Sequence, residues 1–267
     1  MNKVEGILLW ISLFSYFIGF VFFLSSLVLK KGSNRYGLYL TMAGFLINTL
    51  SMSVRWYVSG HPPVQGNYEN ALLGGWFLVL VYIISSIKIP KVIHLGAFTN
   101  PIAMLIIGLG FRSSTKVEAL APPYQNNWLW IHVGFSWLGF SAFVVAFVMG
   151  IIYLFKFYRY DVNDQPYLSR LEDLMLAYII FGFISQMFSI ASGAIWASTL
   201  WGKYWSWDPL ETWSLIYWLT YGIIIHLRLT WGLQKEKMAW MSVLGIVTAI
   251  ISFWGIGVGK GIHTPLL

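Results

Sequence analysis

The sequence contains no cysteine and little charge. Without a thiol the chain has no disulfides and no thiolate metal ligands, so any metal depends on histidine, carboxylate, methionine or tyrosine. Asp, Glu, Lys and Arg make up 10% of the residues, against about 25% in soluble domains, while hydrophobic residues make up 58%. This balance excludes an ordinary soluble domain and predicts an integral membrane protein.

The apolar residues fall into runs that are each long enough, as a helix, to cross a hydrocarbon core of about 30 Å. The runs cover 5–29, 36–54, 71–87, 92–111, 130–155, 173–196, 212–232 and 238–258. The first is too long for a signal-peptide core and no small-residue cleavage site precedes Lys30, so we expect it to be retained. The prediction is an all-α, polytopic transmembrane bundle of about eight helices, forming a single domain over 1–267.

The formal net charge of +7 does not indicate nucleic-acid binding, because the basic residues are scattered at the ends of the apolar runs and form no continuous patch. Their placement bears on topology instead, since Lys and Arg are enriched in short cytoplasmic loops. Most of the 17 Lys and Arg residues fall in inner loops when the amino terminus is outside. We therefore expect both termini outside and the largest inner loop at 156–172.

A tryptophan-rich stretch lies between two apolar runs, in the predicted outer segment 196–213. It reads Trp201-Gly-Lys-Tyr-Trp-Ser-Trp-Asp-Pro-Leu-Glu-Thr-Trp213. Tryptophans also form plain anchoring belts at membrane surfaces, which would explain one or two of them. Here Asp208-Pro209 sets a turn and is suited to cap a helix that begins at about Leu210. We expect a rigid aromatic shelf, which favours a flat, polarizable ligand such as a porphyrin.

Two histidines are expected beside this shelf on the outer face. His132 lies within the first turns of the run 130–155, and His263 follows a glycine-rich tail. Two imidazoles can supply both axial positions of a haem iron while aromatic rings cover the macrocycle. The chain has no Cys-x-x-Cys-His motif and could not hold haem by thioether bonds, so this binding would be reversible.

His226 is expected deep in the membrane, about 21 Å below the outer surface, at about 1.5 Å per residue from Thr212. An ionisable residue at that depth is a functional candidate by default, although a neutral imidazole bonded to a neighbouring helix is the alternative. Arg228 points about 200° away around the same helix. We expect Arg228 at the inner lipid boundary and His226 facing the bundle.

The two remaining histidines have simpler interpretations. His61, in the outer segment 55–70, is either a metal ligand or a side chain that hydrogen-bonds the neighbouring backbone, and the second reading is favoured. His94 lies near the inner surface, where an interfacial histidine that faces water is the favoured reading.

The Trp-rich stretch resembles the signature of the CcsA/ResC-type cytochrome c assembly proteins, which are haem-handling membrane proteins with a WWD domain. Their pattern Trp-Gly-x-x-Trp-x-Trp-Asp-Pro-x-Glu-x-Trp is complete at 201–213. Arg55-Trp-Tyr-x-Ser-Gly-His61-x-Pro with Asn67-Tyr-Glu69 is similar to the early outer-loop motif of the family. Gly257-Val-Gly-x-Gly-x-His263 is similar to its carboxy-terminal motif. The resemblance therefore extends over most of the chain.

The resemblance implies transport and display of haem b, bound non-covalently as a substrate. Haem would arrive from the inner side, be displayed on the outer shelf, and be joined to the Cys-x-x-Cys-His motif of apocytochrome c. The residues so implied are the outer iron ligands His132 and His263, the inner iron ligand His226, and the shelf residues Trp201, Trp205, Trp207, Asp208 and Trp213.

The resemblance also implies a partner and a membrane. The partner is a membrane protein of the ResB/CcsB type, which is not fused to this chain and which supplies the second ligand of the inner site, or else His94 does. The membrane is a bacterial inner (cytoplasmic) membrane or a thylakoid membrane, with the Trp-rich segment on the periplasmic or lumenal side. Together the two proteins would form a holocytochrome c synthase of the lyase type, with no catalytic residue identified in this chain.

Several roles remain open at the level of sequence. Asp208 and Glu211 are suited to proton transfer or, more in keeping with their positions, to helix capping. Four cations are candidate partners for haem propionates: Lys203, Arg55, Arg112 and Lys116. The alternative functions are a haem exporter that serves a haem chaperone without synthase activity, a haem or small-molecule transporter, and a non-catalytic membrane subunit anchored by its tryptophans.

Overall fold

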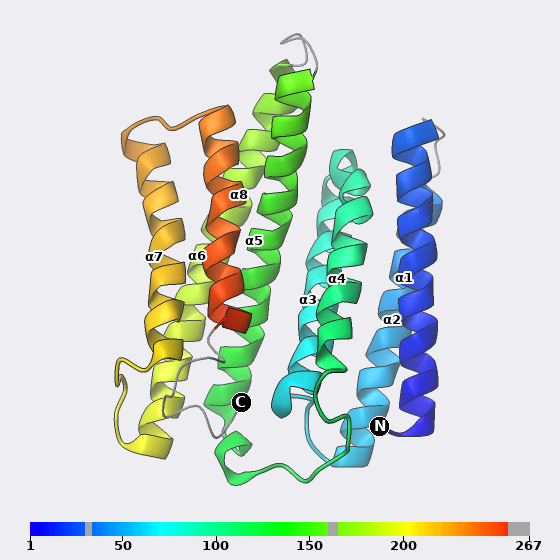
Figure 1. Ribbon diagram of the computed structural model, residues 1–267, viewed down its shortest axis with the longest axis vertical. Helices are drawn as coiled ribbons and strands as arrows, with labels where there is room; N and C mark the ends of the chain where they lie inside the picture. Colours follow the sequence, from blue (N-terminus) through cyan, green and yellow to red (C-terminus); the bar gives the residue numbers. More distant parts are fainter. Residues whose placement is uncertain (30–33, 160–164, 256–267) are drawn as a thin grey trace. The chain divides into compact units, whose positions relative to one another are not determined.

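The computed structural model describes residues 1–29, 34–159 and 165–255, and every regular element in these ranges is helical (Figure 1). The chain divides into two compact units by its internal contacts, and the single membrane domain over 1–267 stays a prediction. Unit 1 covers Met1–Gln125 and unit 2 covers Asn126–Leu267. The two units are described separately below.

Unit 1 is built from four α-helices that pack α1 with α2, α2 with α3, α3 with α4, and α4 with α1, with a smaller contact between α2 and α4. The helices are α1 (Lys3–Leu29), α2 (Asn34–Ser59), α3 (Gly66–Lys88) and α4 (Gly96–Gly110). A 3-10 turn, η1 (Pro90–Leu95), joins α3 to α4, and η2 (Pro122–Tyr124) interrupts the loop after α4. Consecutive helices run antiparallel, as expected for helices joined by short connections (Figure 1).

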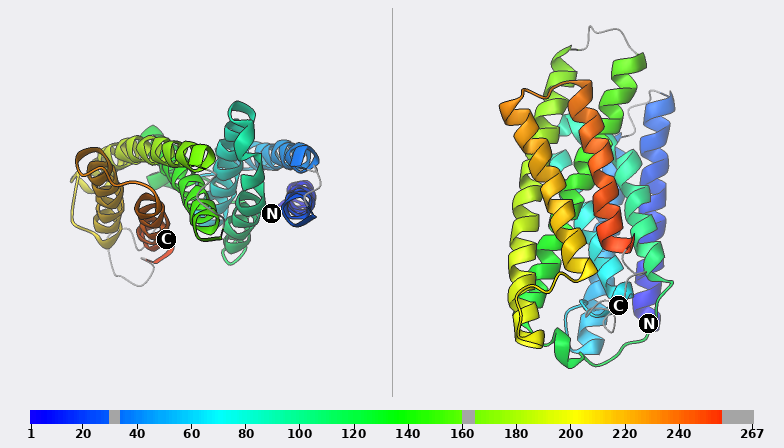
Figure 2. Two further views of the ribbon diagram at one scale, coloured as in Figure 1. Left: turned by 90° about the horizontal axis from the view of Figure 1, so that it is seen from above. Right: turned by 60° about the vertical axis from the view of Figure 1, so that its left-hand side comes forward.

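Unit 2 repeats this arrangement in the order α5, α6, α7, α8 and back to α5, and its first two helices are longer than any helix of unit 1. The helices are α5 (Asn127–Arg159), α6 (Gln165–Trp201), α7 (Pro209–Thr230) and α8 (Glu236–Ile250), followed by a π-helical turn, η4 (Ile251–Gly255). The start of α5, the end of α6, the start of α7 and the end of α8 lie at one end of the unit (Figures 1 and 2). The Trp-rich segment therefore shares an end with the first turns of α5.

Seven of the described helices are long and apolar enough to span a membrane. The exception is α7, which has 22 residues but carries Glu211, His226 and Arg228. Length and composition thus confirm an integral membrane protein with a helical fold and seven to eight spanning helices. The position of the termini relative to the membrane remains a prediction.

Helix boundaries differ most from the sequence prediction at the charged end of α5 and the charged start of α6. The predicted loop 156–172 is largely helical, because α5 continues to Arg159 and α6 begins at Gln165. Charged side chains do not end a helix that projects beyond the apolar zone, and the Lys156 ammonium lies 4.0 Å from the ring centroid of Tyr167. This cation–π contact ties the two extensions together.

Candidate haem-display site

The Trp-rich segment is a short connection between α6 and α7 whose shape is set by its carboxylates. Asp208 is the N-cap of α7, since its side chain accepts a hydrogen bond from the Leu210 N–H at 2.9 Å. The Glu211 carboxylate reaches back and accepts from the Ser206 N–H at 2.7 Å and the Asp208 N–H at 3.3 Å. These bonds form a capping box, and they confirm the predicted cap, with α7 beginning at Pro209.

The backbone of Trp207 turns the chain just before this cap. Its φ is +59°, a left-handed conformation that costs a bulky residue about 1–3 kcal/mol and tends to occur at functional sites. The Trp207 side chain is 69% exposed, whereas the neighbouring Trp205 is half-buried. The two indoles meet edge to face with ring centroids 5.9 Å apart. The turn therefore separates one inward tryptophan from one outward tryptophan.

His132 lies on α5 and faces α6. Its Nδ1 is 2.8 Å from the Ser189 carbonyl oxygen and 3.2 Å from the Ser189 hydroxyl. The imidazole also lies nearly parallel to the Trp196 indole, with ring centroids 6.4 Å apart. The His132 ring is thus fixed on α6, between the Ser189 carbonyl and the Trp196 indole.

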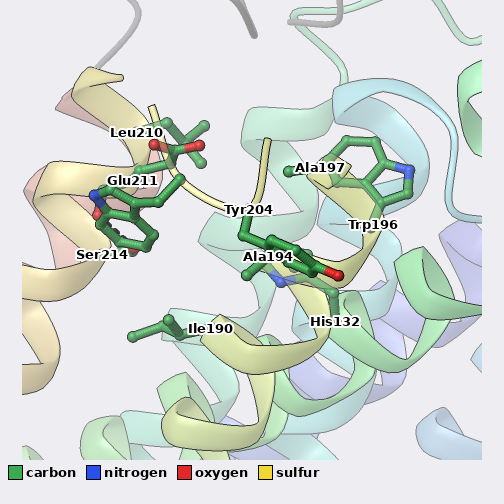
Figure 3. A pocket seen from close by; sticks show the side chains of 11 residues that line it. His132, Ile190, Ala194, Trp196, Ala197, Tyr204, Leu210, Glu211 and Ser214 are labelled. Atoms are coloured by element: carbon green, nitrogen blue, oxygen red, sulfur yellow. Dashed lines mark hydrogen bonds between the residues drawn. The ribbon is translucent and has the colours of Figure 1, made fainter. Parts of the chain in front are cut away.

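A pocket opens beside His132, with an empty volume of about 410 Å³ that includes space open to solvent. In Figure 3, Leu210, Glu211 and Ser214 line one side of it, and His132, Ala194 and Trp196 line the other. The remaining lining residues are Ile190, Gly193, Ala197, Tyr204 and Trp205. A mainly apolar lining with a few polar groups is typical of sites for small organic ligands.

The pocket fits a haem edge in two respects. The indole N–H of Trp205 is buried and makes no hydrogen bond within the described part of the chain, so a donor is left for an acceptor on a bound molecule. One imidazole, that of His132, would be available to ligate a haem iron, while no group of three His, Cys, Asp or Glu gathers as a metal site among the described residues. The donor set suits haem iron, which needs two axial ligands, better than a bare metal ion.

The other predicted shelf residues lie around the pocket. Trp201 packs edge to face on Trp196 with ring centroids 5.5 Å apart, and thus supports a lining residue. Trp213 is half-buried on α7, and Trp207 contacts Trp205. His263 lies outside the described residues.

The orientation predicted for α7 is wrong. His226 is exposed on the surface of unit 2, while Arg228 is the side chain that turns inward. The Arg228 guanidinium lies 2.6 Å from the carboxylate of Glu172, a buried residue of α6, and donates to the Leu233 carbonyl oxygen at 2.9 Å. An opposing carboxylate on α6 offsets the cost of burying the arginine, so His226 is rotated outward.

The early motif in unit 1 forms a buried ionic cluster. Arg55 is 2% exposed and donates to Glu69 at 2.6 Å through Nε and to Glu5 at 3.0 Å through Nη1. The same guanidinium also donates to the carbonyl oxygens of Thr115 and Lys116. Arg55 is buried in unit 1 with its hydrogen bonds made there, so it is ruled out as a propionate partner.

His61 holds the same loop. It is 5% exposed, and its Nδ1 and Nε2 lie 2.8 Å from the Pro62 oxygen and 3.1 Å from the Glu118 oxygen. This confirms the reading that His61 bonds the backbone. Further along the loop, burial raises the pKa of the Tyr124 hydroxyl, which lies against the Gly66 backbone.

His94 is half-buried in η1.

Sequence reasoning missed several residues of the pocket. Trp196 precedes the recognised signature and Tyr204 is one of its variable positions, and both line the pocket, while Ser189 and Gly193 contact His132. The available signal was spacing, since positions 189, 193 and 196 follow each other by four and three residues and so share one helix face.

The fold and the pocket define a polytopic helical membrane protein with a mainly apolar site beside one histidine. A family model described as "Cytochrome C assembly protein" matches residues 65–263. The chain is 30% identical to the cytochrome c biogenesis protein CcsA of Guillardia theta, over 98% of this chain and 94% of that protein. It is 32% identical to CcsA of Chlamydomonas reinhardtii, over 82% of this chain and 65% of that protein.

The chain belongs to the cytochrome c assembly family of the CcsA type. A solved structure titled "Cytochrome c Heme Lyase CcmF" has a similar fold, with a TM-score of 0.74 at 16% identity. The match covers 99% of this chain and 48% of the chain in that structure. Membership of the family gives the protein a role in cytochrome c maturation, in a family that handles haem and acts with other maturation components.

Proposed function

We propose that this chain is the haem-handling subunit of a cytochrome c synthase. It carries haem b to the outer face of the membrane and presents it for attachment to the Cys-x-x-Cys-His motif of apocytochrome c. Haem is bound non-covalently and is the substrate. The observation that supports this most directly is the pocket in which His132, the buried Trp205 N–H and an aromatic lining come together.

His263 is proposed as the second iron ligand on this face. The described chain ends at Gly255, two residues after Phe253. Phe253 packs on Trp137 with ring centroids 4.8 Å apart, and Trp137 lies only five residues beyond His132 on α5. The end of the described chain is thus anchored about 7.5 Å along α5 from His132, at about 1.5 Å per residue.

Lys203 is proposed as a propionate partner. It is exposed and directly precedes Tyr204, which lines the pocket. The other two remaining candidates, Arg112 and Lys116, are exposed in the loop of unit 1. Lys203 is the candidate that shares its segment with the pocket.

The inner haem site is proposed at the outward face of α7. An imidazole that faces lipid is costly, so a side chain such as His226 is expected to be covered in the working protein. Its neighbours on this face, Ile223 and Leu229, are 55% and 70% exposed. A ResB/CcsB-type membrane partner that packs here would shield His226 and supply the second ligand to haem.

Attachment adds each cysteine thiol across a haem vinyl group, so the sulfur bonds one carbon and the hydrogen goes to the other. No residue of this chain is needed as a proton acceptor overall. The protein contributes by holding the haem edge and the peptide in register. Asp208 and Glu211 serve as the cap of α7, as their hydrogen bonds indicate.

Co-expression with a ResB/CcsB-type partner and a reporter apocytochrome tests this function. The complex should copurify with b-type haem and yield cytochrome with covalently attached haem, and omission of the partner should abolish the product. A haem-free complex from haem-replete cells would overturn the proposal. Haem on the complex without covalent product would favour the alternative, a presenter that serves a haem chaperone.

His226→Ala separates the inner site from the outer site. The variant should fold and assemble but carry little haem at either site, because the outer site would no longer be supplied. Leu229→Ala, on the same exposed face, should keep its haem. A fully loaded and active His226→Ala complex would remove the inner site.

A further inference from the structure

The imidazole of His132 is oriented by the backbone of α6. Its Nδ1 lies 2.8 Å from the Ser189 carbonyl oxygen, which can only accept a hydrogen bond, so Nδ1 carries the proton. In a neutral imidazole with a protonated Nδ1, the lone pair is on Nε2. The carbonyl of Ser189 thus selects the tautomer in which Nε2 is the ligand atom.

The same ring lies against α6 at a position where no side chain fits. A Cβ at Gly193 would be 2.6 Å from His132 Nδ1 and 3.0 Å from its Cε1, well inside van der Waals contact. Ser189 and Gly193 are four residues apart and face His132 from successive turns of α6. Ser189 supplies the hydrogen-bond acceptor, and Gly193, one turn later, leaves the space that the imidazole occupies.

We propose that the Ser189 carbonyl and the bare backbone at Gly193 are positioning elements that set the tautomer and the place of His132 for iron ligation. The inference rests on the proposed haem-presenting function and adds two residues that act through His132. A hydrogen bond to the second nitrogen of a ligating histidine typically changes metal affinity by about 10–100-fold. Displacement of the ring by a new methyl group should have an effect of at least that order.

The Ser189 hydroxyl has a smaller part. It donates to the His132 carbonyl oxygen at 3.2 Å and lies 3.2 Å from Nδ1. Because the carbonyl of residue 189 remains after substitution, Ser189→Ala should leave haem binding within about twofold of the unchanged protein. The main test therefore falls on Gly193.

Gly193→Ala should lower haem occupancy at the outer site at least about tenfold and convert the remaining haem from a six-coordinate, bis-imidazole spectrum to a five-coordinate one. Gly134→Ala is the matched control, since Gly134 lies on α5 two residues after His132 and a Cβ there has nothing within 4 Å. Both variants should insert and keep their helices, because alanine favours a helix more than glycine does. Equal spectra for the two variants would overturn the positioning role of Gly193.

A double variant shows whether Gly193 acts through His132. His132→Gly should lose haem and regain part of it when imidazole is added, and Gly193→Ala in that background should cost little more, because the ring it would displace is gone. Additive losses would overturn the inference. If His132→Gly alone keeps its bis-imidazole haem, the ligand assignment of the proposed function fails instead.

The tautomer is measured without haem. Nitrogen NMR of histidine-labelled, haem-free protein should show His132 with a protonated Nδ1 and a bare Nε2, and Gly193→Ala should shift this signal whereas Gly134→Ala should not. His132→Gly identifies the resonance by its disappearance. A protonated Nε2 in the unchanged protein would overturn the role of the Ser189 carbonyl.

Discussion

The ionic cluster of unit 1 and the pocket of unit 2 are built from similar residues and do different things. Each combines a histidine, a carboxylate at the first turn of a helix and several aromatic rings. In unit 1 both nitrogens of His61 face carbonyl oxygens of the backbone, so neither is directed at a ligand and the ring stabilises a loop. In unit 2 the Ser189 carbonyl engages His132 Nδ1, and the ring lines a pocket. The partners of a histidine, more than its presence in a motif, separate a structural role from a binding role.

The carboxylates make the same contrast. Glu69 accepts from Arg55 at 2.6 Å and from the Gln65 N–H at 2.7 Å, within a cluster that also buries Glu5. Glu211 accepts from neutral N–H and O–H groups and shapes the loop that carries Trp205. Unit 1 therefore depends on charge pairing, and the pocket depends on capping.

The largest expected effect is the loss of haem from His132→Gly. Removal of an iron ligand should reduce haem retention by more than the about 10–100-fold that loss of a hydrogen bond to the ligand's second nitrogen costs, and added imidazole should restore part of it. The fold should persist. His61→Gln should keep the haem spectrum, so a matching loss of haem in both variants would erase the distinction between the two histidines. Visible spectra of the purified complexes provide the measurement.

Arg55→Ala should instead act on stability. It leaves the carboxylates of Glu5 and Glu69 buried without their cation, which typically costs about 3–5 kcal/mol. The thermal midpoint in detergent should fall strongly, while the haem that remains bound should show an unchanged spectrum. A five-coordinate haem spectrum in this variant would mean that the cluster contributes to the haem site.

His61→Ala should destabilise unit 1 more mildly. The ring contacts with two carbonyl oxygens are removed, and the one to which the ring donates its N–H is worth about 0.5–1.5 kcal/mol. Limited proteolysis should cleave after Lys116 sooner than in the unchanged protein, because the loop loses its contact through Glu118. Unchanged cleavage would show that the loop is held without His61, by contacts such as those of Arg55 and Gln65.

Asp208→Ala should give the smallest effect. The loss of the cap on the Leu210 N–H costs about 1 kcal/mol, and Asp208→Asn should restore most of it because an amide oxygen also caps a helix. Thermal melting of the two variants provides the measurement. If Asp208→Asn is as inactive in the synthase assay as Asp208→Ala, the carboxylate has a role beyond capping.

Much of the fold was accessible from the sequence. Each of the eight α-helices overlaps one of the predicted apolar runs, and the N-cap at Asp208 was assigned from its position before Pro209. These features depend on local chemistry, namely apolar length and hydrogen bonding within one turn. The ends of α5 and α6 were not accessible, because polar residues are compatible both with a loop and with a helix that projects into water.

The site was accessible in part. His132 and Trp205 were selected and line the pocket, whereas Trp196 and Gly193 were missed because their contribution depends on how α5 and α6 pack, and Tyr204 because it depends on the path of the connection to α7. Arg55 was a candidate for propionate binding until Glu5, 50 positions earlier, was found beside it. Contacts between distant positions of this kind leave no local pattern in a single sequence.

By itself the sequence determined that the chain spans a membrane as helices, and that a capped, tryptophan-rich turn lies between two of them. Both follow from the composition of short stretches. The face of α7 was decided only by tertiary structure. Residues 226 and 228 must point about 200° apart, but helical geometry does not say which of them faces inward. The carboxylate of Glu172 on α6 decides it, because a buried arginine needs that partner while an exposed histidine does not.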